Sequence, residues 1–171
     1  MNEHRHIAPR KRNPRLPPGR LALAPVVDAL LADGMLEPAD AARAKASARQ
    51  GQASESVHPL VLLANLKLAS ARVPGSELGL EQLTEWLAGE VGHPYRRIYP
   101  TRLDVAGVTD LVSHAYARRH RILPLEVMPD RAVVATSEPL ELDWLGDVQR
   151  MLRREIDLVV ASPLDLHRYT M

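Results

Sequence analysis

The chain has 171 residues and a formal net charge of +1, so it suits one domain with a small appendage and carries no broad field that would attract nucleic acid. It contains no cysteine, which excludes disulfide bonds and thiolate metal sites. No apolar run approaches the roughly 20 residues that span a bilayer. The N-terminus also lacks the apolar core of a signal peptide, so neither a membrane span nor secretion is expected.

The first stretch, residues 1–20, is basic and rich in proline. It holds few aliphatic side chains to bury, so we expect a disordered tail. Two roles are open for such a tail. It could simply keep the chain soluble, or it could contact anionic lipid or an acidic partner through its basic side chains.

Residues 21–68 are expected to form a helical subdomain. Apolar residues recur at helical spacing in residues 21–33, and Gly34 follows as a left-handed cap. An alanine-rich helix is predicted over residues 39–50 and a buried, apolar helix over residues 60–68. The small side chains of the second helix allow close packing but bury little area.

Residues 80–171 are predicted to form an α/β domain. The apolar pattern predicts helices over residues 80–91 and 140–154, and a third helix with Asp104 as N-cap and a last turn in the basic run 118–121. It predicts strands over residues 122–128, 132–135 and 156–161. The last strand can pair parallel to a hairpin strand through a right-handed crossover. Ser162 and Pro163 then start a final helix. The predicted fold class is α+β: a small three-stranded sheet flanked by helices and preceded by the helical subdomain.

Two predictions concern the side chains of the expected helix over residues 140–154. Four of its apolar side chains should face the sheet: Leu145, Val148, Met151 and Leu152. Four acidic residues lie near its start, where they complement the helix dipole: Glu138, Glu141, Asp143 and Asp147. Acid–base catalysis is a poorer explanation of these carboxylates, because no other cleft-forming residues accompany them.

The sequence contains no motif that is typical of a catalytic or metal site. The phosphate-binding loop G-x-x-x-x-G-K-[ST], the zinc motif H-E-x-x-H and the nucleophile motif G-x-S-x-G are all missing. Of the seven histidines only His4 and His6 are close together, and a metal site needs three or four fixed ligands. We therefore expect no catalytic, metal-binding or cofactor-binding residue in this chain, and no enzyme activity of its own.

Basic residues supply the candidate functional surface. Five of them are predicted to bind a partner: Arg96, Arg97, Arg118, Arg119 and Arg121. The plainer interpretation is a solvated, basic helix end. The functional interpretation is a patch that docks an acidic protein surface or a phosphate. Few aromatic residues accompany these arginines, which disfavours nucleic-acid binding.

Four separate segments resemble those of a known family, and they follow one another in the same order. They are Gly92 with Pro94 and Tyr95, Tyr116 with residues 122–125, residues 133–139, and residues 160–165. In this order they resemble the N-terminal domain of type II secretion system protein E and of the related type IV pilus assembly ATPases. The resemblance begins near residue 80 and covers about half of the chain, and residues 21–68 resemble the leading helices of that family more loosely.

The resemblance implies a non-catalytic docking domain that precedes an ATPase motor. Its expected partners are the cytoplasmic part of an inner-membrane platform protein and the downstream ATPase domain. Its expected location is the cytoplasm, peripheral to the inner membrane. ATP and magnesium would belong only to the motor, so the full-length protein would be an ATPase while this part needs no cofactor.

Some relatives bind cyclic di-GMP through a helical motif that begins R-L-G and ends in Gln, so a cyclic di-GMP sensor is the alternative function. Aligning that motif on Gly34 places Pro25 at the Arg position, Val27 at the Gly position and Ala48 at the Gln position. Arg20 and Gln50 are present but lie in a different frame.

Overall fold

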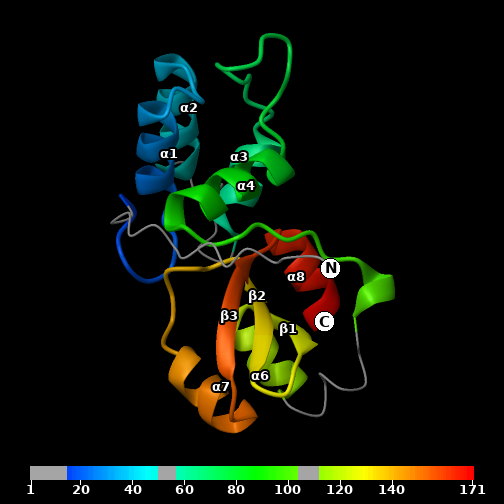
Figure 1. Ribbon diagram of the computed structural model, residues 1–171. Helices are drawn as coiled ribbons and strands as arrows, with labels where there is room; N and C mark the ends of the chain where they lie inside the picture. Colours follow the sequence, from blue (N-terminus) through cyan, green and yellow to red (C-terminus); the bar gives the residue numbers. More distant parts are fainter. Residues whose placement is uncertain (1–14, 50–56, 104–111) are drawn as a thin grey trace.

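The computed structural model describes residues 15–49, 57–103 and 112–171. The α-helices are α1 (Leu23–Ala32), α2 (Pro38–Arg49), α3 (Pro59–Asn65), α4 (Leu80–Val91), α6 (His114–His120), α7 (Leu145–Leu152) and α8 (Pro163–Thr170), with a short 3-10 helix, η1, at Pro100–Arg102. The strands are β1 (Ile122–Val127), β2 (Arg131–Thr136) and β3 (Glu155–Val160). Helices α1 to α4 form one half of the molecule, and the sheet with α6, α7 and α8 forms the other (Figure 1).

The sheet has three strands in the order β1-β2-β3 within the described part of the chain. β1 and β2 form the predicted antiparallel hairpin, and β2 pairs parallel with β3. The predicted α+β fold is therefore confirmed. Strand β2 is buried along nearly its whole length, because helices cover both faces of the sheet and leave only its first residue half-buried.

Side chains alternate between two cores along the central strand. Ala132 and Val134 point to the face covered by α6 and α7, where they pack against the buried Trp144. Val133 and Ala135 point to the opposite face, where α8 contributes Leu166. This period of two is what an extended chain imposes, and it explains why so few aromatic residues are needed to fill either layer.

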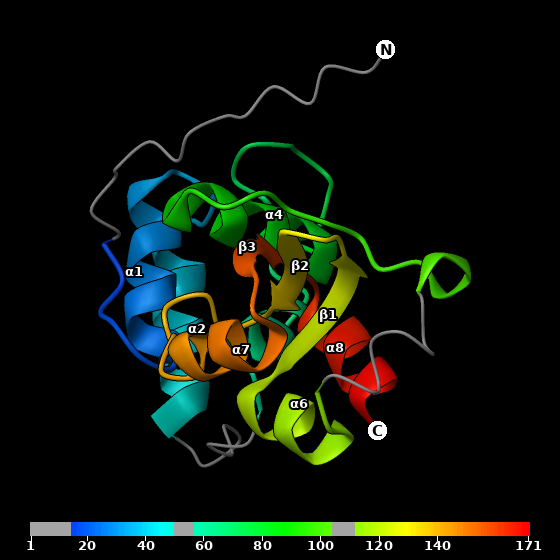
Figure 2. The same cartoon turned by 60° about the horizontal axis from the view of Figure 1, so that its bottom comes forward.

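The helical half has a core of its own. Val26, Val27 and Leu30 of α1 are fully buried there, and α3 and α4 add leucines. Helices α1 and α2 pack side by side (Figure 2). The sequence assigned α4 to the α/β domain, but α4 packs into the helical core and also contacts β3, and Val160 of β3 joins the same core. Helix α4 is thus the element that both halves share.

Residues 15–22, which we call the strap, carry structure that the sequence did not predict. Leu16 and Leu21 are buried. The backbone N–H of Gly19 donates to the carbonyl of Leu140 at 2.9 Å. Arg15 binds Glu90 of α4 through its Nε and Nη2 atoms at 2.9 and 2.8 Å. These few contacts hold the segment in place although it has little apolar content. Residues 15–20, which the sequence assigned to a disordered tail, therefore have a defined position. Residues 1–14 lie outside the described residues.

Two predicted helices differ from the structure. Helix α6 begins at His114, where the Ser113 hydroxyl accepts a hydrogen bond from the N–H of Tyr116 at 3.2 Å. The proposed start at Asp104 falls in residues 104–111, which lie outside the described residues. Helix α7 begins at Leu145 instead of residue 140. Val148 and Leu152 are buried as predicted, but Met151 is 49% exposed, so its predicted contact with the sheet is wrong.

Both edges of the sheet are partly protected within the described residues. In β1, Pro124 lacks an N–H, and the register with β2 shifts between Pro124 and Glu126. On the other side, the extended segment after α4 pairs with the last residue of β3: Arg96 donates its N–H to the Val160 carbonyl at 2.9 Å, and Val160 donates to Pro94 at 2.8 Å. Both edges are thus interrupted at one point, which makes pairing with another strand less favourable.

We predict that Val134→Asp unfolds the α/β half. Val134 is fully buried between α6 and α7, and an unpaired carboxylate there costs several kcal/mol (~3 or more). Circular dichroism and thermal melting measure the loss. Val73→Asp is the matched control, because Val73 is 54% exposed; a normal melt for Val134→Asp would contradict the assigned strand.

We also predict that Arg15→Ala lowers the free energy of unfolding by about 1–3 kcal/mol, because it leaves the carboxylate of Glu90 buried without its partner. The Glu90 side chain is only 4% exposed. Urea denaturation measures the change. The double variant Arg15→Ala/Glu90→Gln should recover part of it, and Arg43→Ala, in an exposed pair on α2, should change stability by less than about 0.5 kcal/mol.

Candidate functional site

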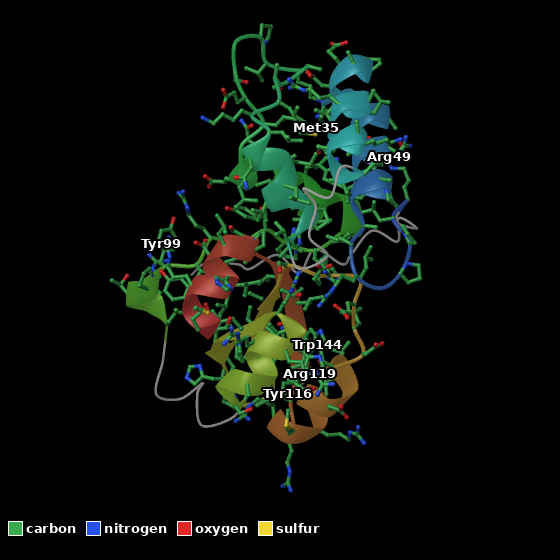
Figure 3. All side chains as sticks on the ribbon, turned by 180° about the vertical axis from the view of Figure 1, so that it is seen from behind. Met35, Arg49, Tyr99, Tyr116, Arg119 and Trp144 are labelled. Carbon is green, nitrogen blue, oxygen red and sulfur yellow. The ribbon has the colours of Figure 1, made fainter. Side chains whose placement is uncertain are left out.

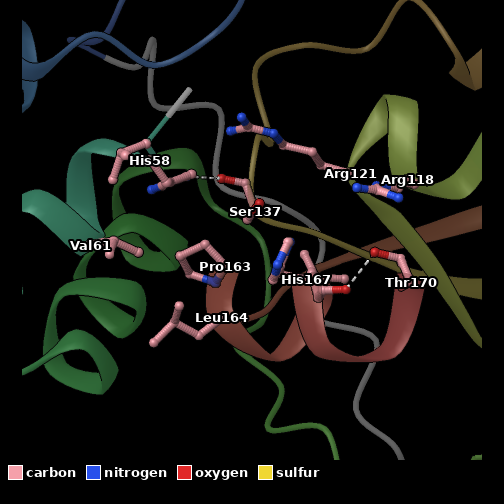
Figure 4. A pocket seen from close by; sticks show the side chains of 11 residues that line it. His58, Val61, Arg118, Arg121, Ser137, Pro163, Leu164, His167 and Thr170 are labelled. Atoms are coloured by element: carbon pink, nitrogen blue, oxygen red, sulfur yellow. Dashed lines mark hydrogen bonds between the residues drawn. The ribbon is translucent and has the colours of Figure 1, made fainter. Parts of the chain in front are cut away.

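A cavity of about 400 Å³ opens where the two halves meet. Its walls come from the start of α3, the end of α6, the loop after β2, and α8. It is lined by Val57, His58, Val61, Arg118, Arg121, Ser137, Pro163, Leu164, Leu166, His167 and Thr170. Figure 4 shows Arg118 and Arg121 entering from the α6 side, His58 and Val61 from the α3 side, and His167 and Thr170 from α8. We call it the α6–α8 pocket.

The lining of the α6–α8 pocket is basic and aliphatic. The described residues that line it include two arginines and two histidines and no acidic residue. Valine, proline and leucine side chains form the rest of the wall, apart from the hydroxyls of Ser137 and Thr170. The Thr170 hydroxyl already donates to the Leu166 carbonyl at 2.8 Å. The pocket therefore suits a group that is negatively charged at one end and apolar at the other.

The local sequence explains why basic side chains gather here. Helix α6 has no acidic residue in its first turn and carries Arg118, Arg119 and His120 in its last turn, where the helix dipole favours cations. Arg121 then takes a left-handed conformation, with φ of 53°, that ends the helix. Among the described residues no carboxylate pairs with Arg118, which is exposed at the rim of the pocket.

Glu138 lies directly behind the α6–α8 pocket and is fully buried. Its Oε2 accepts the backbone N–H of Leu21 in the strap at 2.9 Å, and its Oε1 accepts from Arg121 at 3.2 Å. Removal of the carboxylate from water raises its pKa to about 7, although the Leu21 N–H and the Arg121 charge act in the opposite direction. The sequence placed Glu138 at a helix start as a dipole partner, and the structure corrects this: α7 begins seven residues later, at Leu145.

His58 is the second buried polar residue at this junction, with 5% of its surface exposed. Its Nδ1 accepts the N–H of Leu60 at 3.1 Å and so caps α3. Its Nε2 lies 2.7 Å from the carbonyl of Ser137, so this nitrogen carries the proton and donates it. Burial lowers the pKa of His58 to about 4. The ring is therefore neutral, and its 3.7 Å approach to Glu138 is not an ion pair.

The five predicted arginines do not form one cluster. Arg118 and Arg121 line the α6–α8 pocket, whereas Arg119 is exposed on α6 outside the lining. Arg96 pairs with Glu126, near the far end of β1 from Arg121, at 2.9 Å. Tyr116 and Arg119 lie together in the α/β half, away from Met35 and Arg49 in the helical half (Figure 3).

Arg96 and Arg97 belong to a second hollow of about 380 Å³ beside the extended segment that follows α4. Arg97 pairs with Glu81 at 3.2 Å. Tyr99 forms part of the same wall and receives the Arg102 guanidinium over its ring at 5.7 Å. Here the cations have acidic or aromatic partners within the chain, which distinguishes this hollow from the α6–α8 pocket.

Sequence reasoning missed Glu138, His58 and His167 as site residues. The available signal for Glu138 was its place just after a buried strand. His58 directly precedes Pro59, the first residue of α3, which marks it as a helix cap. The described residues contain no group of three or more His, Asp or Glu side chains that could hold a metal. None of the described helices has the length and apolarity to cross a bilayer.

Two solved structures share this fold. It is similar to a solved structure of MshE with cdg, at a TM-score of 0.60 and 20% identity, covering 85% of this chain and 95% of the other. It is also similar to the N-terminal domain of XpsE, at a TM-score of 0.54 and 17% identity, covering 88% of this chain and 96% of the other.

Residues 91–170 match the MshEN domain. The chain is 34% identical over 113 residues to the type IV pilus assembly ATPase TfpB of Acinetobacter baylyi (strain ATCC 33305 / BD413 / ADP1). That match covers 66% of this chain and 19% of the relative, so the chain spans about a fifth of the relative's length. The resemblance found in the sequence is therefore confirmed.

We predict that stability falls by about 1 kcal/mol as the pH rises from 6.5 to 8, because the folded chain loses the proton that Glu138 holds more tightly than the unfolded chain does. The folded-state pKa of Glu138 lies above its ordinary value of 4.5, so the stabilising effect of its proton disappears as the pH rises through about 7. His58 acts in the other direction, mainly below pH 6.5, and its contribution is the same in wild type and in a variant of Glu138. Its neutral form stabilises the fold above its ordinary pKa of 6.5, and this is lost as the pH falls towards about 4.

Thermal melts of wild type and Glu138→Gln across this range measure the effect. The variant should melt higher than wild type at pH 8 and should lack the loss of stability that Glu138 causes between pH 6.5 and 8. Glu155→Gln, at an exposed residue at the start of β3, should keep the wild-type slope. An identical slope in Glu138→Gln would show that another group carries the titration.

Proposed function

We propose that this chain is the N-terminal docking domain of a type II secretion or type IV pilus assembly ATPase and binds the cytoplasmic part of an inner-membrane platform protein. The observation that carries the proposal is the MshEN domain at residues 91–170 together with the sequence match to a pilus assembly ATPase. The domain would then sit in the cytoplasm, held to the inner membrane through its partner.

The shape of the domain supports a docking role rather than a reaction. Its sheet is covered on both faces, which gives short helices such as α6 and α8 a rigid base. The polar groups at the junction of the halves bind one another: Glu138 is held by Leu21 and Arg121, and His58 by Ser137. Because the chain spans only about a fifth of the relative, we place the ATPase motor, with its ATP and magnesium, in the remainder of a longer protein.

A pull-down with the cytoplasmic part of the cognate platform protein tests this proposal, and we expect the chain to be retained. Val134→Asp is the control, since an unfolded α/β half should lose the interaction. Absence of binding at low salt, both for this chain and for the longer protein that contains it, would contradict the docking role.

The second candidate function is a cyclic di-GMP sensor, and the similarity to the structure of MshE with cdg is the observation that favours it. Three positions of this chain argue against the known motif. Val27, at its Gly position, is fully buried, Pro25 stands at its Arg position on α1, and Ala48 on α2 stands at its Gln position. Titration calorimetry with cyclic di-GMP decides the matter, and we expect no heat of binding at high micromolar ligand.

A further inference from the structure

We propose that the α6–α8 pocket receives an acidic, aliphatic segment of the protein partner. A carboxylate of that segment pairs with Arg118 at the rim, and a Leu, Ile or Val side chain enters the aliphatic part of the pocket. The inference rests on the proposed docking function and adds to it the surface used and the chemistry of the partner.

The charge of the pocket points to a carboxylate. Arg118 is exposed, and no acidic residue among the described ones pairs with it, whereas Arg96 and Arg97 are each paired within the chain. Arg121 is already bound to the buried Glu138. It therefore adds positive potential at the back of the pocket, while Arg118 contacts the carboxylate of the partner. Guanidinium groups bind carboxylates through two parallel hydrogen bonds, which gives direction as well as affinity.

The apolar wall points to a protein side chain rather than a free anion. Leu164 is 51% exposed at the rim, Val57 and Val61 are half-buried, and Leu166 is buried behind them. A volume of about 400 Å³ accepts one or two aliphatic side chains and not a whole helix. An apolar centre with a charged rim is the usual arrangement of the residues that dominate a protein–protein interface.

The same lining disfavours a nucleotide. Among the lining residues that the structure describes there is no Tyr or Trp side chain to stack on a base. Helix α8 opens with Pro163 after its N-cap Ser162, so the first helical residue has no N–H to offer a phosphate. Both features favour an acidic peptide segment over a phosphorylated ligand.

Charge reversal at Arg118 tests the inference in the intact chain. Binding of the platform protein's cytoplasmic part is measured by titration with wild type, Arg118→Glu and Leu164→Asp. We expect each variant to bind at least tenfold more weakly with an unchanged melting temperature, because both side chains are exposed. Arg119→Glu is the matched control: it makes the same charge change one residue away on α6, outside the pocket lining, and should alter affinity by less than twofold.

The possible results separate this inference from the function on which it rests. If wild type binds and Arg118→Glu binds equally well, the pocket is not the docking site, and the docking function stands. Equal weakening by Arg118→Glu and Arg119→Glu would reduce the effect to general charge attraction and would also overturn the inference. If wild type does not bind at all, the proposed function fails and the inference fails with it. If Arg118→Glu instead abolishes binding of cyclic di-GMP or of phosphatidylglycerol vesicles, the pocket serves a phosphate ligand and the peptide assignment is wrong.

Discussion

The hydrogen bonds of the adjacent residues Ser137 and Glu138 hold three other segments of the chain together. The carboxylate of Glu138 binds the strap at Leu21, 117 residues away, and Arg121 at the end of α6, while the carbonyl of its neighbour Ser137 binds His58 at the start of α3. A carboxylate in this position is costly, because burial raises its pKa towards neutrality. The chain tolerates that cost at the one place where the helical half, the strap and the sheet all meet.

This junction also shapes the α6–α8 pocket. One wall belongs to α3 of the helical half, and the others belong to α6 and α8 of the α/β half. The pocket therefore keeps its form only while the two halves remain docked as they are here, and anything bound in it contacts both. The affinity for such a partner would therefore change if the relative placement of the two halves changed. An event that altered the contacts of Glu138 or of the strap would have the same effect.

The sequence predicted most reliably what local patterns determine. The three strands lie within about two residues of their expected ends, because runs of β-branched residues bounded by turn residues leave few alternatives. The start of α7 was misplaced because residues 140–144 have a helical apolar pattern, while in the structure the Leu140 carbonyl accepts from Gly19 and Trp144 donates to the Glu141 carbonyl. Arg118 was identified from charge alone, but the burial of Glu138 depends on distant residues that no local pattern records.

The interrupted edges of the sheet affect how copies of this domain interact when they are close together. A proline and a register shift interrupt β1, and the chain's own backbone pairs with β3 at its last residue, Val160. Extended pairing of strands between two copies is therefore disfavoured at these points. Contacts made there through side chains break and form again more easily than a shared sheet would.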